Sequence, residues 1–162
     1  MSDTSFRELV RINKRLSDAE CVEVLEQQTR GVLSVLGENG YPYGMPMNHY
    51  YEREDGCIYF HCGNVGHRLD ALRACGKVSF CVYEPGRARD GDWALMVRSV
   101  IVFGQIEILD DMDRITDITT KLSHKFTQDD AYIQTEIRQH GHRTLLLRLK
   151  PEHIRGKLVK ES

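Results

Sequence analysis

The sequence lacks any long hydrophobic run. None of its apolar stretches approaches the roughly 18 residues that a transmembrane helix needs, and the N-terminal residues have neither the basic nor the apolar segment of a secretory signal. The chain also lacks an excess of either charge, because 22 Lys and Arg stand against 24 Asp and Glu, for a net charge of -2. No general attraction for nucleic acid or for an anionic membrane is therefore present. We expect a cytoplasmic protein that binds neither, with any anion site formed by a local cluster.

Paired cysteine motifs are absent as well. The five cysteines make an odd number, and no two of them have CxxC spacing. This usage is typical of reduced thiols in a cytosol, most of them small core residues, rather than of a disulfide framework. No repeat, linker or low-complexity segment interrupts the 162 residues, a length that suits one domain with its own core. We therefore expect a single domain over residues 1–162.

What is present is a series of short apolar segments separated by turns. The connections at 37–42 and 52–56 are too short for the crossovers of a parallel sheet. The sequence therefore predicts a mainly β fold, a barrel-like antiparallel sheet of about six strands with peripheral helices. The predicted strands cover residues 32–36, 43–51, 57–62, 78–83 and 144–150, together with one bent strand or two strands over 93–109.

Two residues interrupt the predicted strands. Pro46 cannot donate to a hydrogen-bond ladder, so it requires a sheet edge or a bulge and leaves neighbouring backbone groups free. Gly104 lies in the middle of the 93–109 stretch, where a glycine marks a bulge or a close approach of another backbone. Near the C-terminus, residues 154–159 extend the last strand past Pro151 if the chain stays straight there.

The helices have clear sequence signals. Ser17 and Glu20 have the spacing of a capping box, which predicts a helix start and leaves residues 1–16 as an extended or loosely ordered N-terminal arm. A short helix is predicted near 68–74 from its apolar spacing. A helical hairpin is predicted at about 111–140, before the last strand, because apolar residues recur there at the helical period.

A polar loop before the short helix is the best candidate for a binding site. Backbone N–H groups at the helix start and the guanidinium of Arg68 can converge on one anion, with Gly66 and His67 beside them. The same residues also fit an ordinary solvated first turn. His61 and Cys62 end the preceding strand, so we expect them to face the same anion.

The adjacent histidine and thiol also suggest a metal ligand set or a nucleophile. No second CxxC or HxxxH completes a tetrahedral zinc site, so we predict no metal site. Neighbouring residues on a strand point to opposite faces, which argues against a catalytic pair of His61 and Cys62.

Other polar residues fit a planar ligand. Asn48 and His49 follow Pro46, where freed backbone groups can bind the polar edge of a ring system, although both also fit an exposed sheet face. Trp93 and the segment 98–104 can cover such a ring, with Ser99 as a further phosphate donor. The alternative for this segment is a core strand with one buried tryptophan.

Together these segments resemble the flavin-binding split-barrel superfamily that includes pyridoxamine 5'-phosphate oxidases. Within it, the chain is most similar to the nitroimidazole-resistance (Nim) type of FMN protein. No single motif is diagnostic, but the order and spacing of the motifs are. The resemblance covers residues 18–109 and also fits the last strand, and it rests on residues 43–48, 58–62, 66–70 with 77–82, and 99–104.

The resemblance implies a homodimer of six-stranded split barrels with FMN at each of two subunit interfaces. The isoalloxazine edge would meet the strand of Met45, Pro46, Met47, Asn48 and His49. The phosphate would be held by the segment of His61, Cys62, Gly66, His67 and Arg68. The neighbouring subunit would contribute Trp93, Ser99 and Ile101.

Two residues depart from the family pattern. Arg68 stands where the family commonly has lysine, and a guanidinium preserves anion binding through its bidentate fork. Cys62 stands near a position where serine or threonine is common, and a thiol is a poorer phosphate donor.

The predicted function is that of an FMN-dependent oxidoreductase, in which the flavin does the redox chemistry and the protein positions it. His49 or His61 can donate a proton to a reduced substrate, but no catalytic residue is assigned. The alternative is a flavin or haem carrier or sensor without turnover, with one of these histidines as an axial ligand. The superfamily also allows a deazaflavin in place of FMN. The Nim likeness suggests a nitroaromatic substrate by analogy of fold.

Overall fold

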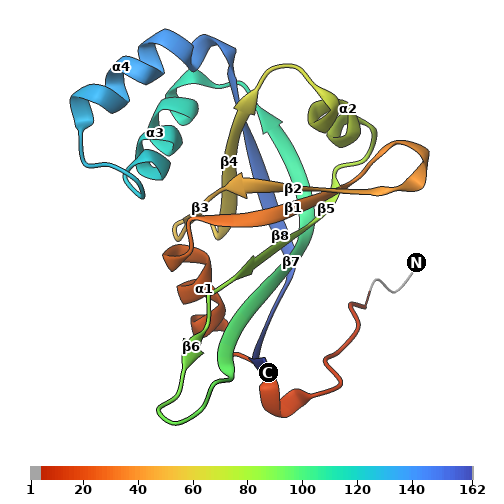
Figure 1. Cartoon of the computed structure of the whole chain (residues 1–162). Coiled ribbons are helices and arrows are strands. Elements are labelled where there is room, and N and C mark those ends of the chain that lie inside the picture. The colour runs from red at the N-terminus through yellow and green to blue at the C-terminus, as the bar shows by residue number, and fades with distance from the viewer. Residues whose placement is uncertain (1–4, 162) are drawn as a thin grey trace.

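The computed structural model describes residues 5–161 and is built around one strongly curled antiparallel sheet (Figure 1). The order of its strands is β2-β1-β5-β7-β8-β4-β3, and β6 pairs with β7. The predicted mainly β split barrel is confirmed; only the short β6 lies outside the six predicted segments, and one segment forms both β2 and β3. The strands are β1 (Arg30–Leu36), β2 (Pro42–Asn48), β3 (Tyr50–Glu52), β4 (Cys57–Gly63), β5 (Lys77–Tyr83), β6 (Arg87–Ala88), β7 (Leu95–Leu109) and β8 (Thr144–Glu161).

The sheet wraps round on itself at His49. The predicted strand 43–51 is divided there into β2 and β3, which lie at opposite ends of the strand order. β2 pairs with β1, whereas β3 pairs with β4. One short bend therefore carries the chain from one end of the sheet to the other, which curls the sheet into a barrel with a split beside β2.

Both predicted strand irregularities are present. Pro46 lies in an edge strand, because the only strand that pairs with β2 among residues 5–161 is β1. In β7, the register against β8 shifts between Phe103 and Gly104. A Cβ atom on Gly104 would lie 2.1 Å from the backbone oxygen of Lys150, so the glycine lets β8 approach. The stretch before 109 is thus one bent strand, and β8 continues past Pro151 as expected.

The main core fills the inside of the barrel. Alternate residues of each strand face it, as in β5, where Val78, Phe80 and Val82 are buried between more exposed neighbours. Two helices add residues to this core, α1 (Asp18–Gln27) below the sheet and α2 (His67–Ala74) above it in Figure 1. The predicted capping box starts α1, as the side chains and backbones of Ser17 and Glu20 bond reciprocally.

A smaller core lies on the outer face of β4 and β8, under the predicted helical hairpin. The hairpin consists of α3 (Met112–Ser123) and α4 (Asp130–His140), and Figure 1 shows it beside the upper part of β4. Ile115 and Ile118 of α3 pack there against Tyr59 and Leu146. The only buried residue of α4 is Ile133, and α4 contacts mainly α3 and the turn that follows it, Gly141–Arg143.

The N-terminal arm runs along β8 and contains one short turn, η1 (Ile12–Lys14). Phe6 stacks on His153 with 4.7 Å between the ring centroids. Residues 1–4 of the predicted arm lie outside the described residues. None of the helices within 5–161 combines the length and the hydrophobicity of a membrane span. Two further turns are η2 (Glu38–Gly40) and η3 (Gly141–Arg143).

Candidate functional site

The predicted anion-binding loop leads directly into α2. Its N-cap is Gly66, with a φ angle of +126° that residues with a side chain rarely adopt. A Cβ atom at this position would meet nothing within 4 Å, so the backbone conformation alone requires the glycine. No side chain within 5–161 caps this helix, so its first N–H groups remain open to a ligand.

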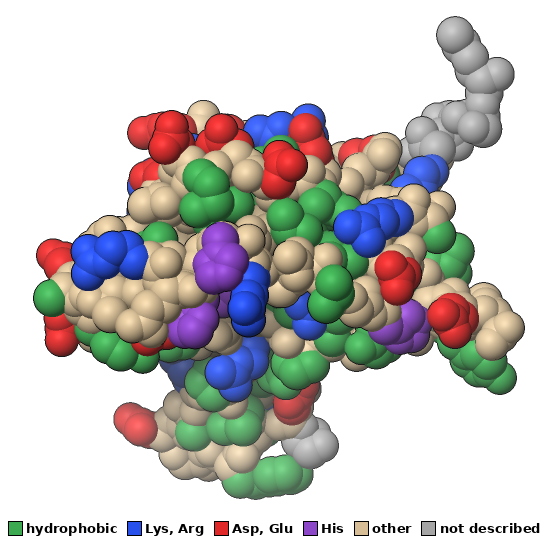
Figure 2. Space-filling model, turned by 90° about the horizontal axis from the view of Figure 1, so that it is seen from above, with side chains coloured by type: hydrophobic (Ala, Val, Ile, Leu, Met, Phe, Trp, Pro, Cys, Tyr) green, Lys and Arg blue, Asp and Glu red, His purple; other side chains and the backbone are tan. Residues whose placement is uncertain are grey.

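A hollow of about 310 Å³ lies beside this loop, where β2, β4 and α2 meet. Its walls include Cys62, His67 and Arg68, and the guanidinium Nε of Arg68 lies 2.9 Å from the Sδ atom of Met45. Figure 2 looks onto this end of the molecule, where histidine and basic side chains lie among hydrophobic ones. The structure thus brings Cys62, Gly66, His67 and Arg68 together at one place that we call the Arg68 hollow, and Met45, which was expected at the ring instead, contacts Arg68 there.

The charge of Arg68 is not neutralised by the rest of the described chain. Asp70 of the same helix pairs with Arg73, at 3.6 Å, and no carboxylate within 5–161 forms an ion pair with Arg68. Burial raises the pKa of the Cys62 thiol despite the nearby guanidinium. At neutral pH the hollow therefore holds a neutral thiol, one free cation and open helix N–H groups, a combination that favours an anion.

Tyr43 completes a wall of the hollow, although the sequence did not single it out as a site residue. Its ring stacks on His67, with 4.6 Å between the centroids and an interplanar angle of 14°. The alternation of side chains along a strand could have identified Tyr43, because it is two residues from Met45 and so lies on the same face of β2.

The free edge of β2 begins at the Arg68 hollow and carries the other residues that were predicted to contact a flavin ring. Met45 and Met47 point into the core, while Pro46 is exposed and Asn48 is half-buried. The amide oxygen of Asn48 accepts a hydrogen bond of 3.0 Å from Arg30 Nε. Three residues of a strand span about 10 Å. Backbone groups of this edge therefore lie about as far from the Arg68 hollow as a ring would lie from the phosphate to which it is joined.

The side chain of His49 does not belong to this surface. It is fully buried, and its Nε2 lies 2.7 Å from the backbone oxygen of Leu25. Burial, together with the charge of Lys125, lowers the pKa of His49 to about 3. The predicted contact of its side chain with a ring, and its role as proton donor or haem ligand, do not fit this position.

His61 and Cys62 do not face one anion, which corrects the sequence-based expectation. Because side chains alternate along β4, Cys62 points to the main core and the Arg68 hollow, whereas His61 lines a separate hollow under the hairpin. Burial and the charge of Arg68 lower the pKa of His61.

The predicted residues of the third segment lie away from the Arg68 hollow of the same chain. Trp93 is 80% exposed before β7, so the alternative of a buried tryptophan is wrong. Ser99 and Ile101 lie on the outer face of β7, and β1 and β5 separate this strand from β2. Three strand spacings amount to about 14 Å, which is too far for contact within one chain.

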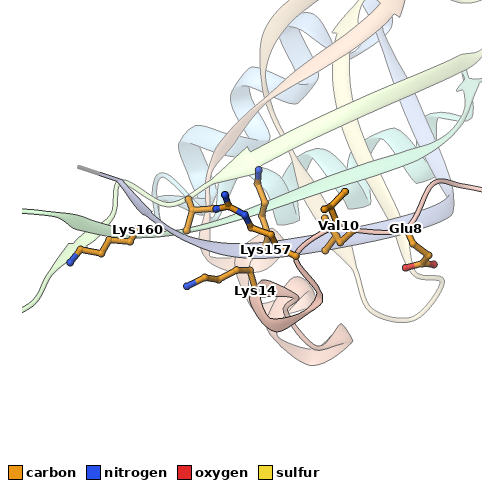
Figure 3. A pocket seen from close by; sticks show the side chains of 8 residues that line it. Glu8, Val10, Lys14, Lys157 and Lys160 are labelled. Atoms are coloured by element: carbon orange, nitrogen blue, oxygen red, sulfur yellow. The ribbon is translucent and has the colours of Figure 1, made fainter.

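Another hollow, larger than the Arg68 hollow, lies elsewhere and does not include any of the predicted site residues. It measures about 590 Å³ and lies between the N-terminal arm and the end of β8. Figure 3 shows the amino groups of Lys14, Lys157 and Lys160 well apart, on side chains that do not converge. Lys160 also pairs with Asp92, at 2.6 Å. This surface has no single point at which an anion would be held.

The curled sheet defines a split barrel, and Arg68 lies beside it at the start of α2, which Gly66 precedes. The chain belongs to the pyridoxamine 5'-phosphate oxidase family, whose model matches residues 17–158. The superfamily resemblance is therefore confirmed. A comparison with curated proteins gives no match.

Three solved structures illustrate the fold. A candidate 5-nitroimidazole antibiotic resistance protein from Bacteroides thetaiotaomicron has a TM-score of 0.74 at 17% identity, covering 91% of this chain and 87% of that one. A conserved hypothetical protein from Mycobacterium tuberculosis has a TM-score of 0.77 at 18% identity, covering 93% and 89%. A FAD-binding protein from Mesorhizobium loti has a TM-score of 0.64 at 24% identity, covering 90% and 97%.

Proposed function

We propose that the chain is a flavoprotein that binds FMN, with the phosphate in the Arg68 hollow and the ring along the free edge of β2. The observation that carries the proposal is the guanidinium of Arg68 at the start of α2, where residues 5–161 supply neither a carboxylate partner nor a side-chain cap. A phosphate offers the charge and the acceptor oxygens that these donors match. Family membership and the name of the FAD-binding protein from Mesorhizobium loti support a flavin as the ligand.

A second copy of the chain would complete the site. Val32, Cys81 and Ile101 are paired across β1, β5 and β7 on the outer face of the sheet, where Val32 and Ile101 are each 37% exposed. Ser99, Ile101 and Trp93 are too far from the Arg68 hollow of their own chain but are free to reach a partner. We therefore propose a homodimer in which this face closes over the flavin bound to the other subunit.

The proposed activity is that of an FMN-dependent oxidoreductase. The bound flavin would supply the redox chemistry, while the chain holds the phosphate, aligns the ring along β2 and excludes water through the second subunit. The name of the Bacteroides neighbour makes a nitroaromatic the first substrate class to test.

The phosphate site is tested by replacing Arg68. We expect Arg68→Ala to weaken FMN binding by about 1.5 to 3 kcal/mol, or roughly ten- to hundredfold, because a charge-assisted hydrogen bond is lost. Arg68→Lys keeps the charge and should retain most of the affinity. Arg73→Ala is the matched control, since Arg73 is an exposed cation on the same helix that pairs with Asp70. Fluorescence titration with FMN measures all four proteins, and equal dissociation constants for wild type and Arg68→Ala would remove Arg68 from the site.

One observation favours the alternative of a flavin carrier or sensor without turnover. Of the two predicted proton donors, His49 is buried and His61 lies on the opposite face of β4 from the Arg68 hollow. The absorption spectrum of the purified protein separates the proposals. Flavin bands that bleach with a nicotinamide reductant and recover with an electron acceptor support the enzyme, whereas bands that do not bleach support the carrier. A Soret band would instead indicate haem, and mass spectrometry of the released ligand would distinguish FMN from a deazaflavin.

A further inference from the structure

A row of three polar side chains crosses the outer face of the sheet at β5, β7 and β8. Tyr83 is paired directly with Ser99, and Ser99 is paired directly with Lys157. Residues that are paired in this way point to the same side of a sheet, with Cβ atoms about 5 Å apart. Tyr83 is 59% exposed and Lys157 is also exposed, so both side chains are open to a partner. We call these three residues the polar row.

The polar row is part of the face that we propose to close over the flavin of the other subunit. Ser99 belongs to both, and Ile101, two residues further along β7, is paired with Arg155 of β8. A closure that brings Ser99 and Ile101 to the flavin therefore brings Lys157 close to it as well. The inference that follows rests on the proposed function.

The Arg68 hollow by itself does not balance the charge of a phosphate. A phosphate monoester carries about 1.5 to 2 negative charges at pH 7. Among the described residues, Arg68 is the only lysine or arginine in the walls of the hollow, and it contributes one positive charge. The N–H groups at the start of α2 add only a partial charge. A second cation from outside the hollow would therefore strengthen phosphate binding.

Lys157 differs from the neighbouring cations of β8 because it has no carboxylate partner within 5–161. Arg155 lies 3.7 Å from Glu8 and its side chain is 18% exposed, while Lys160 pairs with Asp92 at 2.6 Å. Figure 3 shows the amino groups of Lys157 and Lys160 well apart. An ammonium group is a compact charge with three donors that suits a phosphate. Lys157 is therefore available to a ligand of another chain.

We propose that Lys157 of one subunit is the second cation for the phosphate held by Arg68 of the other subunit. Each site of the dimer then takes its two cations from two chains. The hydroxyl of Ser99, beside Lys157, donates to the same phosphate. The chain thereby selects a flavin that ends in a phosphate over riboflavin, which has the same ring and no phosphate.

The selectivity is tested by titrating variants of Lys157 with FMN and with riboflavin, followed by fluorescence. We expect Lys157→Gln to weaken FMN binding about tenfold, because a charge-assisted hydrogen bond is lost, and to leave riboflavin binding unchanged. Lys157→Arg keeps the charge and should keep the affinity for FMN. Lys160→Gln is the matched control on the same strand, since Lys160 already has a partner. Unchanged FMN binding in Lys157→Gln, or an equal loss for both ligands, would overturn the proposal.

A mixed dimer tests whether the two cations come from different chains. Pairing an Arg68→Ala chain with a Lys157→Gln chain, each with its own affinity tag, creates one site that lacks both cations and one that has both. We expect the purified mixed dimer to bind one FMN with wild-type affinity, although each variant alone binds weakly. If both sites of the mixed dimer remain weak, Lys157 does not act across the interface.

The failure of this inference is distinct from the failure of the proposed function. A wild-type protein that does not bind FMN overturns both. If Arg68→Ala weakens FMN binding as expected but Lys157→Gln does not, the phosphate site in the Arg68 hollow stands and only the contribution of Lys157 is refuted.

Discussion

At the scale of single residues, burial decides which of the polar side chains are available for chemistry. His49 and Arg68 both stand out in the sequence, yet the structure separates them completely. His49 Nε2 donates to the backbone oxygen of Leu25 inside the protein, whereas Arg68 lies in a hollow without a carboxylate partner among residues 5–161. The first therefore affects stability, and the second remains free for a ligand.

The buried imidazole of His49 makes stability depend on pH. Its pKa in the folded protein is about 3, below the ordinary value of 6.5, so between these values only the unfolded state takes up the proton. Stability is therefore lost as the pH falls below 6.5, by about 1.4 kcal/mol per unit, or about 2 kcal/mol between pH 6.5 and 5. His61 and His153 shift in the same direction and add to this loss.

Urea unfolding at pH 7 and pH 5 measures this effect. We expect His49→Gln to lose less stability than wild type over this interval, because glutamine does not titrate and can still donate to the backbone oxygen of Leu25. The same pH dependence in both proteins would show that His49 is not the group that titrates.

At the scale of the elements, β7 and β8 approach each other closely at Gly104. A methyl group on Gly104 would lie 2.1 Å from Lys150 O and 2.9 Å from Leu149 Cδ1, so one strand would have to move. We expect Gly104→Ala to destabilise the protein by at least about 1 to 3 kcal/mol, the usual cost of overpacking. Gly63→Ala in β4 is the control, because a Cβ atom there meets nothing within 4 Å.

Denaturant unfolding of the two glycine variants gives both free energies. If Gly104→Ala proves as stable as Gly63→Ala, the approach of β8 is looser than the structure describes. The register shift beside Gly104 would then have another cause.

The elements are also the level at which the sequence was most informative. The capping box at Ser17, the glycine before α2 and the edge proline in β2 were all recognised from local patterns, because each depends on the chemistry of a few neighbouring residues. The break at His49 was not recognised. Residues 43–51 have a continuous strand pattern, and only pairing with two distant strands divides them into β2 and β3.

At the scale of the whole molecule, the proposal of a dimer rests on the exposed outer face of β1, β5 and β7. Ile101 lies near the middle of this face, so Ile101→Glu should place a charge in the interface while leaving the fold intact. We expect this variant to become monomeric and to lose FMN affinity. Tyr132→Glu, at an exposed position of α4, should do neither.

Light scattering after gel filtration, combined with FMN titration, measures both properties. A wild-type monomer that binds FMN with full affinity would contradict the shared site. If the Ile101→Glu variant is still a dimer, the interface must lie on another surface.

The sequence by itself determined most of the elements, the antiparallel class and the cluster of Gly66, His67 and Arg68 at the start of α2, since these follow from local periodicity, capping and short connections. Only the tertiary structure decided which face each side chain occupies. It buried His49 and turned His61 away from Cys62. The physical reason is that burial depends on pairing between residues far apart in the chain, and no local pattern specifies those contacts.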